Sequence, residues 1–254
     1  MKNRIHLTYT ITFESPFHIG TGMSQGLIDR GVARDAGGFL YIPGSTIKGI
    51  LREKCEQLAA CSILEETAPD QIPSPHLLHL RSFAKTPTLV ESIFGSRFRE
   101  GAVYFDNASL IERTSDQGLG KDFFTGREKE DRLTRQHIQQ LQVETRTRTS
   151  ISRQRGTVQE QALFRSEYGI RDLAFAGSIY GSVEGPGISA EICAPVVLLA
   201  AGLRLFDRIG ANKSVGMGKL AFQVADDAIT IETNETNEKT LEKHLHELIE
   251  LLGD

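Results

Sequence analysis

The sequence predicts an α+β fold of the ferredoxin-like type whose core carries large insertions. Two observations predict it. Near the amino-terminus, a strand at residues 5–13 and a short strand at 38–42 lead into a helix at 45–60. Near the carboxy-terminus, an apolar helix at 194–209 is followed by a glycine-rich loop and a strand at 220–224. This order of strands and helices is typical of the ferredoxin-like fold.

The first strand is predicted by strict alternation of two residue types. Its apolar residues are Ile5, Leu7, Tyr9, Ile11 and Phe13, and the polar residues between them are His6, Thr8, Thr10 and Thr12. Side chains of a strand point alternately to its two faces, so this pattern predicts one buried and one exposed face. A glycine-rich loop follows at residues 21–29.

The helix at residues 45–60 begins with features of a phosphate-binding site. Pro43 and Gly44 form a turn, and Ser45 is a natural helix N-cap. Lys48 and Arg52 are four residues apart and share one face, whereas the core-facing residues are Ile47, Ile50 and Leu51. The first-turn amides and the helix dipole favour an anion in front of the helix. A phosphate is the natural ligand, although ordinary surface helices begin in the same way.

The middle of the chain holds two predicted insertions. Residues 61–87 are irregular and contain four prolines, and residues 111–142 are polar and rich in charge, with a helix predicted at 127–141. Between the insertions, residues 88–94 are predicted as a helix and residues 101–110 as a strand.

Residues 143–164 are predicted to form a long β-hairpin with a basic tip, Arg153-Gln154-Arg155-Gly156. Four arginines alternate along it: Arg146, Arg148, Arg153 and Arg155. Period two places each pair on one face of a strand, which gives a cationic stripe. A solvated run of charge is the alternative. Beyond the hairpin, a strand is predicted at 172–180 and an amphipathic helix within residues 236–254.

Composition indicates a globular protein and limits its partners. The 254 residues suffice for one elaborated domain, and no run of about 18 apolar residues predicts a membrane span. Three cysteines do not make a disulfide framework, so a reducing cytoplasm is expected.

Charge is distributed unevenly along the chain. The formal net charge is −4, but residues 226–254 hold nine acidic residues and two lysines, a net of −7, so the other 225 residues carry +3. Residues 127–155 hold eight basic and four acidic residues, a net of +4. Local fields decide where a polyanion binds, so it would bind the basic region and avoid the acidic tail.

A second glycine-rich loop, residues 210–218, joins the last apolar helix to the last core strand. Its glycines let the backbone approach a ligand closely, and Lys213 and Ser214 are suited to phosphate oxygens. The loop is not a P-loop, because the strand-then-helix order is reversed and the GxxxxGK[ST] pattern is missing. A flexible surface loop is the alternative.

Gly20-Thr21-Gly22 is not a dinucleotide site either, because Gln25 stands where the third glycine of GxGxxG belongs.

Several motifs follow one another in the order of a known family. They are Ser15-Pro16-Phe17-His18-Ile19-Gly20-Thr21-Gly22 with Asp29 and Asp35 after it, the PGSTIKGILR segment at 43–52, Ser92-Ile93-Phe94-Gly95, the basic segment at 144–167, and the glycine-rich loop at 210–218. In this order they resemble the RAMP superfamily, the RNA-binding proteins of CRISPR systems. The resemblance is greatest to the backbone subunit of type III effector complexes.

The resemblance implies a modified RNA-recognition fold with a thumb, the hairpin at 143–164, that wedges between bases of a guide–target duplex. Apolar Ile151 or Val158 near the tip would be the wedge. The residues expected to contact RNA are His18, Ser45, Lys48, Arg52, Arg146, Arg148, Arg153, Arg155, Lys213 and Ser214. The expected partners are a guide RNA, a target RNA, further copies of this chain in a filament and other effector subunits, with no membrane.

The resemblance also implies that Asp29 cleaves the target RNA with Mg²⁺ or Mn²⁺. A carboxylate beside the scissile phosphate can hold the metal, orient the 2′-hydroxyl or help to remove its proton. Arg30, directly after Asp29, departs from the family pattern. A loop aspartate is more often a turn former or a cap, and we expect that role for Asp35, because residues 35–38 resemble a turn.

Cys55, Cys61, His76 and His79 form a candidate zinc set, and some members of the family carry zinc at this point of the fold. The spacing is irregular for such a site. However, the proline-rich insertion has no evident core and would gain order from a metal.

Three other functions compete with a target-cleaving backbone subunit. The first is a catalytically inert scaffold of the same complex, and the second is a metal-independent, histidine-dependent nuclease that processes precursor guide RNA. The third is an unrelated α+β protein whose basic hairpin binds a protein partner.

Overall fold

The computed structural model describes residues 2–22, 28–61, 88–97, 99–111, 119–125, 135–187 and 193–232. The strands are β1 (Lys2–Phe13), β2 (Tyr41–Ile42), β3 (Val103–Phe105), β4 (Ala108–Leu110), β5 (Val143–Ile151), β6 (Val158–Gly169), β7 (Ala174–Glu184) and β8 (Leu220–Glu232). The helices are α1 (Gly44–Cys61), α2 (Leu89–Phe94), α3 (Lys121–Thr125), α4 (Arg135–Leu141), α5 (Ala194–Arg204) and the 3₁₀ helix η3 (Lys213–Val215).

The main sheet is antiparallel and has the strand order β2-β4-β7-β1-β8, with β3 also paired to β7. Helix α1 follows β1, and helix α5 lies between β7 and β8 in the chain. With β3 and β4 counted as one divided strand, this is the βαββαβ order of the ferredoxin-like fold. The predicted fold class is therefore confirmed.

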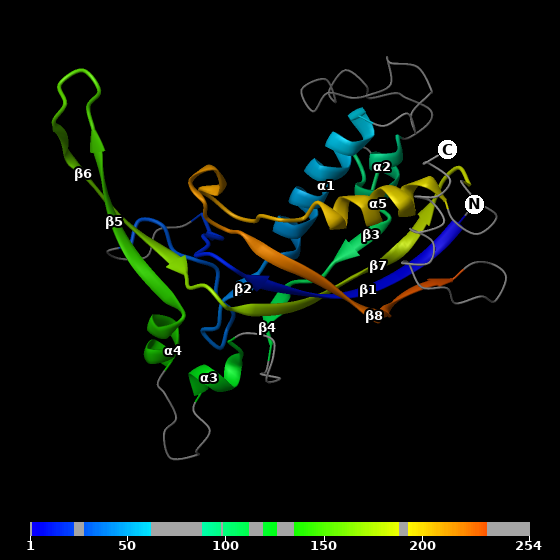
Figure 1. The fold of residues 1–254 in the computed structure, drawn as a ribbon, viewed down its shortest axis with the longest axis horizontal. Coiled ribbons are helices and arrows are strands. Elements are labelled where there is room, and N and C mark those ends of the chain that lie inside the picture. Colours follow the sequence, from blue (N-terminus) through cyan, green and yellow to red (C-terminus); the bar gives the residue numbers. More distant parts are fainter. Residues whose placement is uncertain are drawn as a thin grey trace.

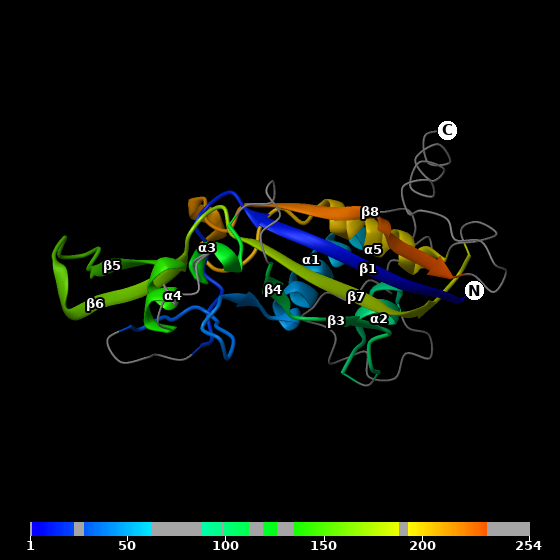
Figure 2. The ribbon, with the colours of Figure 1, turned by 90° about the horizontal axis from the view of Figure 1, so that it is seen from below.

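Helices α1, α2 and α5 cover one face of this sheet (Figure 1). The five apolar residues of β1 are at most 5% exposed, which confirms the predicted alternation. They pack against apolar residues of both long helices, among them Ile47, Leu51, Val196, Leu199 and Leu203. Seen from below, strands β8, β1 and β7 run in front of α1 and α5, with α3 at one end (Figure 2), so the long helices leave the other face of these strands uncovered.

The β5–β6 hairpin is a separate two-stranded sheet that projects from one end of the molecule (Figure 1). Its pairs run from Val143↔Gly169 to Ile151↔Val158, so it is five residues longer than the predicted 143–164. At its base, Phe17 forms an isolated bridge with Gly169, and Arg30 forms one with Ser166. These bridges attach the hairpin to the segments that precede and follow residue 20.

Four further boundaries differ from the prediction for reasons that the structure shows. The strand predicted at 101–110 is divided, because its register to β7 shifts by one residue between Phe105↔Ile179 and Ser109↔Ala176, and Asn107 in the gap accepts from the Gly44 N–H instead. Strand β8 extends to Glu232, beyond the predicted 224, because it resumes pairing with β1 after a bulge opposite residues 7–9. Helix α5 ends at Arg204 and not at 209. Just after it, the N–H groups of Leu205 and Phe206 donate to the carbonyls three residues back, and these bonds tighten the last turn.

The fourth boundary concerns Ser45. Helix α1 begins at Gly44, so Ser45 lies inside the first turn and the N-cap prediction is wrong. The first turn is held instead by Pro43, whose carbonyl accepts from Thr46 and Ile47, and by the Asn107 amide oxygen, which accepts from Gly44. A side chain from a neighbouring strand thus replaces the expected local cap.

Several predicted elements are confirmed, and others lie outside the described residues. Helix α2 matches the helix predicted at 88–94, and Asp35 closes a turn by accepting from the Phe39 N–H at 2.9 Å. Of the insertion predicted at 61–87, residue 61 is the last residue of α1, and residues 62–87 lie outside the described residues. The helix predicted within 236–254 also lies outside them. None of the described helices is long and apolar enough to cross a membrane.

Candidate nucleic-acid interface

Four segments that are far apart in the sequence meet at one cavity of about 480 Å³, which we call the junction pocket. It is lined by His18, Ile19, Gly20 and Gly22, by Asp29, Arg30 and Gly31, by Thr46 in the first turn of α1, and by Gly210 and Ala211. Both glycine turns, the Asp29 loop and the start of α1 therefore open onto the same space. The sequence placed these motifs in order but did not place them together.

The two glycine turns are joined directly through the backbone of His18. The Ala211 N–H donates to the His18 carbonyl at 2.9 Å, and the preceding Gly210 has a φ of +91°. A β-carbon on Gly210 would lie 2.5 Å from the His18 carbonyl oxygen, and one on Gly20 would lie 2.9 Å from the His18 ring. Only glycine permits both the left-handed turn and these close approaches.

The Asp29 loop is fixed on the free edge of β6. Asp29 donates its backbone N–H to the Arg165 carbonyl at 2.9 Å, and its Oδ2 accepts from the Arg165 N–H at 2.8 Å. The Arg30 carbonyl accepts from the Glu167 N–H at 2.9 Å. Asp29 is exposed and lines the pocket, while Oδ2 of its carboxylate is held by the hairpin.

His18 is buried in the wall of the pocket, with only 7% of its surface exposed. Its Nδ1 lies 2.7 Å from the carbonyl oxygen of Glu167. A carbonyl oxygen only accepts, so Nδ1 carries the proton, and Nε2 is left on the side of Gly20. The ring is thus held in one orientation by the base of the hairpin.

A buried ion pair supports the Asp29 loop from below. Glu167 Oε2 accepts from Arg34 Nη1 at 2.9 Å and from the Val32 N–H at 3.3 Å, and the two side chains are 9% and 12% exposed. The carboxylate therefore ties β6 to the segment that carries Asp29. Sequence reasoning quoted Glu167 as part of a motif but missed this role.

Tyr168 connects the basic hairpin to the glycine-rich loop, and the sequence analysis did not identify it. It is 2% exposed, and its ring lies 5.3 Å from the Arg146 guanidinium and 5.4 Å from that of Arg148. Its hydroxyl lies 3.3 Å from Nδ2 of Asn212, which donates to it. Arg146 also pairs with Glu144. The first two arginines of the predicted stripe thus lie over the ring that contacts the 210–218 loop. The sequence feature that could have indicated Tyr168 is its position directly after a basic, strand-forming run.

The two arginines at the tip are arranged differently. Arg153 and Arg155 are exposed but lie in the turn between β5 and β6, where Ser152 accepts from the N–H groups of Arg155 and Gly156. The two-residue period of a strand does not apply in a turn, so that part of the stripe prediction is wrong. Ile151 and Val158, which pair next to the turn, are 61% and 58% exposed, as a wedge requires.

Helix α1 presents two different faces. Thr46 lines the pocket. Glu53 lies about two helical turns later on the same face and pairs with Lys213 at 3.7 Å, so this face points to the glycine-rich loop. Arg52 points elsewhere, since it pairs with Glu56 at 2.8 Å and donates to the Gly95 carbonyl at 3.2 Å. Lys48 is half-buried, and neither it nor Arg52 lines the pocket. Their contact with RNA stays a prediction.

Three further predicted RNA contacts lie on the rim. Ser45 is exposed in the first turn of α1, and Lys213 and Ser214 are exposed on η3, next to the segment that lines the pocket. Asn212 and Gly216 flank η3 in the left-handed conformation.

The candidate zinc set is only partly described. His76, His79 and the side chain of Cys61 lie outside the described residues. Cys55 is buried in the core, where its Sγ donates to the Leu198 carbonyl at 3.5 Å, and burial raises the pKa of its thiol to about 12. This environment suits a neutral core thiol, and zinc stays a prediction.

The comparisons with known proteins bear on the family. A family model described as the RAMP superfamily matches residues 10–221, which is most of the chain and includes every segment of the junction pocket. The chain belongs to the RAMP superfamily. No curated protein matches it.

Solved structures agree with this RAMP fold. A chain in "Type III-B Cmr-beta Cryo-EM structure of the Apo state" is similar, with a TM-score of 0.54 and 13% sequence identity, over 88% of this chain and 98% of that chain. A chain in "Cryo-EM structure of the Type III-B Cmr-beta bound to cognate target RNA" gives a TM-score of 0.55 and 14% identity over the same shares. At this identity the likeness concerns the fold.

Proposed function

We propose that this chain is a guide-RNA-binding backbone subunit of a type III CRISPR effector complex, and that it cleaves the paired target RNA at Asp29. The observation that carries the proposal is the convergence of His18, Asp29, Thr46 and Gly210 on one pocket beside a basic hairpin. RAMP membership and the likeness to chains of Cmr-beta structures, one of them bound to target RNA, support it.

RNA would bind mainly through its phosphates. The Gly20 and Gly210 turns and the first turn of α1 supply close backbone approach, and Arg146 and Arg148 supply positive charge beside them. Such contacts are independent of base sequence, so the guide would select the target by base pairing. The exposed Ile151–Val158 pair at the hairpin tip would separate neighbouring bases.

The donor set at Asp29 fits a divalent metal that is shared with RNA. Among the described residues no group of three or more His, Cys, Asp or Glu side chains gathers here, and Asp29 is the one carboxylate among those that line the pocket. Mg²⁺ typically binds through one or two carboxylates together with substrate phosphates and water. Asp29 would hold the ion, and the ion would supply charge stabilisation at the scissile phosphate. Arg165 orients the carboxylate through its N–H, and the buried His18 keeps the pocket wall rigid.

Cleavage by an assembled complex tests the proposal. We expect Asp29→Ala to reduce cleavage of a guide-complementary RNA by at least about 100-fold while guide RNA remains bound. Asp207→Asn, at an exposed aspartate outside the pocket, is the matched control and should cleave normally. Unchanged cleavage by Asp29→Ala would identify an inert scaffold. Metal-independent cleavage of repeat RNA by the isolated chain in EDTA would identify a processing nuclease instead.

A further inference from the structure

The face of the sheet opposite the helices carries two exposed aromatic rings. Tyr104 of β3 and Tyr180 of β7 are 50% and 40% exposed and form a register pair, with ring centroids 5.7 Å apart and planes inclined by 23°. Their neighbours Val103 and Ile179 are at most 2% exposed and face the helices. Successive side chains of a strand alternate, so both tyrosines point to the open face.

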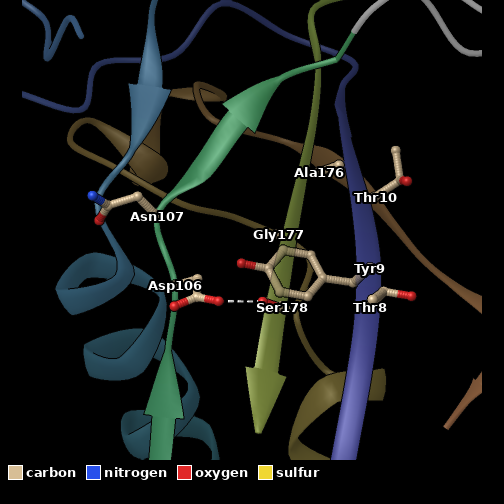
Figure 3. Close-up of a pocket in the computed structure, with 8 residues that line it drawn as sticks. All are labelled: Thr8, Tyr9, Thr10, Asp106, Asn107, Ala176, Gly177 and Ser178. Carbon is tan, nitrogen blue, oxygen red and sulfur yellow. Dashed lines mark hydrogen bonds between the residues drawn. The ribbon is translucent and has the colours of Figure 1, made fainter.

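A polar pocket of about 470 Å³ lies one step along the same face (Figure 3). Asp106 and Ser178 line it, each two residues from one of the tyrosines, and Thr8 lines it from β1. The Ser178 hydroxyl donates to the Asp106 carboxylate. Residues two apart in a strand are separated by about 7 Å, so this pocket begins where the aromatic surface ends.

The pocket depends on the division of the edge strand. Asp106 and Asn107 stand between β3 and β4, where the register to β7 shifts by one residue, and both line the space beside β7. Behind it, the Tyr9 ring extends towards Asp106 (Figure 3), and its buried hydroxyl has no hydrogen-bond partner among the described residues. An unpaired polar atom of this kind is typical of a wall that a polar ligand or water completes.

The charges around the pocket suit a nucleotide. His6 stands opposite Tyr180 in the register, and Arg4 lies two residues further along the exposed side of β1. The arrangement therefore runs from a carboxylate with hydroxyls, past two stacked rings, to basic side chains. The ribose and the base of one nucleotide would meet the carboxylate with its hydroxyls and the two rings, and the basic side chains would meet the phosphate of a neighbouring nucleotide.

We propose that this open-face site, formed by Tyr104, Tyr180, Asp106, Ser178 and Thr8, binds one nucleotide of single-stranded RNA. The base stacks on the tyrosine pair, and the 2′-hydroxyl donates to the Asp106 carboxylate. Aromatic rings on an open sheet are a general means of stacking unpaired bases, and the 2′-hydroxyl distinguishes RNA from DNA. Exposed tyrosines are also common in protein interfaces, but such an interface gives no reason for the adjacent carboxylate–hydroxyl pocket.

The open-face site shares no residue with the junction pocket, so the two sites are tested separately. The full chain is irradiated with a ten-nucleotide oligouridylate that contains 4-thiouridine, and the crosslinked peptides are identified by mass spectrometry. We expect one crosslink at Tyr104 or Tyr180, in addition to any at the junction pocket or hairpin. The matching DNA oligonucleotide with 4-thiothymidine should crosslink to the tyrosines less strongly.

Variants separate stacking from recognition of the ribose. The double change Tyr104→Ala and Tyr180→Ala should lower crosslinking at this site at least about 5-fold, since stacking on a ring is measured by such truncations. The double change to phenylalanine keeps both rings and should crosslink normally, as should the control Phe123→Ala, at an exposed ring on α3. Asp106→Ala should abolish the preference for RNA over DNA.

Two results would overturn the proposal. One is crosslinking confined to the junction pocket and hairpin, with yields that the alanine changes leave intact. The other is altered sedimentation of the full chain in the double alanine variant without any change in crosslinking, which would mark the face as a protein-binding surface.

Discussion

Replacing Glu167 by alanine tests whether the Asp29 loop depends on the buried ion pair beneath it. Glu167 Oε2 lies 2.9 Å from Arg34 Nη1 and 3.3 Å from the Val32 nitrogen, and the carboxylate and guanidinium are about nine-tenths buried. Truncation leaves the guanidinium in the interior without a counter-ion. It also leaves one backbone N–H with no acceptor.

The size of the effect follows from this geometry. Removing one partner of a buried ion pair costs about 3–5 kcal/mol, because the remaining charge stays desolvated. The Val32 bond is long and adds little. A domain of this kind is stable by about 5–15 kcal/mol, so Glu167→Ala should remove a large part of the free energy of unfolding. The double change Arg34→Met with Glu167→Leu removes both charges and should cost about 1.5 kcal/mol or less.

Urea unfolding followed by circular dichroism at 222 nm measures these differences in the free energy of unfolding. They appear as shifts of the midpoint urea concentration at an unchanged m-value. The matched control is Glu14→Ala, whose pair with Lys219 lies 2.6 Å apart but is about half exposed, so its loss should cost at most about 1 kcal/mol. The reasoning is refuted if Glu167→Ala costs no more than Glu14→Ala. It is also refuted if the double variant is as unstable as the two single losses added together.

Two other predictions concern the hairpin and the core. Changing Arg146 or Arg148 to glutamine should weaken RNA binding, and each change should lower the slope of log Kd against log salt concentration by about one unit. The control Arg171→Gln, at an exposed arginine outside the hairpin, should leave the slope unaltered. A raised pKa of about 12 leaves Cys55 with about three orders of magnitude less thiolate at pH 8 than an ordinary thiol, so iodoacetamide should label it only after unfolding in urea. Because the folded pKa is the higher one, the stability that Cys55 contributes is present below about pH 9 and falls as pH rises towards 12. Equal labelling rates in native protein and in urea would contradict this assignment.

The sequence determined most of the secondary structure and the fold class. The alternation in β1, the apolar run of α5 and the basic turn at 153–156 are local patterns. The strand has one buried face, the helix is largely buried and the turn is exposed, as these patterns predict. The boundaries that failed depend on distant partners. Asn107 and not Ser45 caps α1, and β8 is lengthened by pairing with β1.

Only the tertiary structure decided which candidate residues act together. His18, Asp29 and Gly210 were separate motifs in the sequence, and they meet because β1, the base of the hairpin and the last loop converge at one end of the sheet. The same packing directed Arg52 to Gly95 and placed Tyr168 between the arginines and Asn212. Periodicity fixes the face of an element on which a side chain lies, but long-range pairing fixes what that face meets, and no local pattern encodes it.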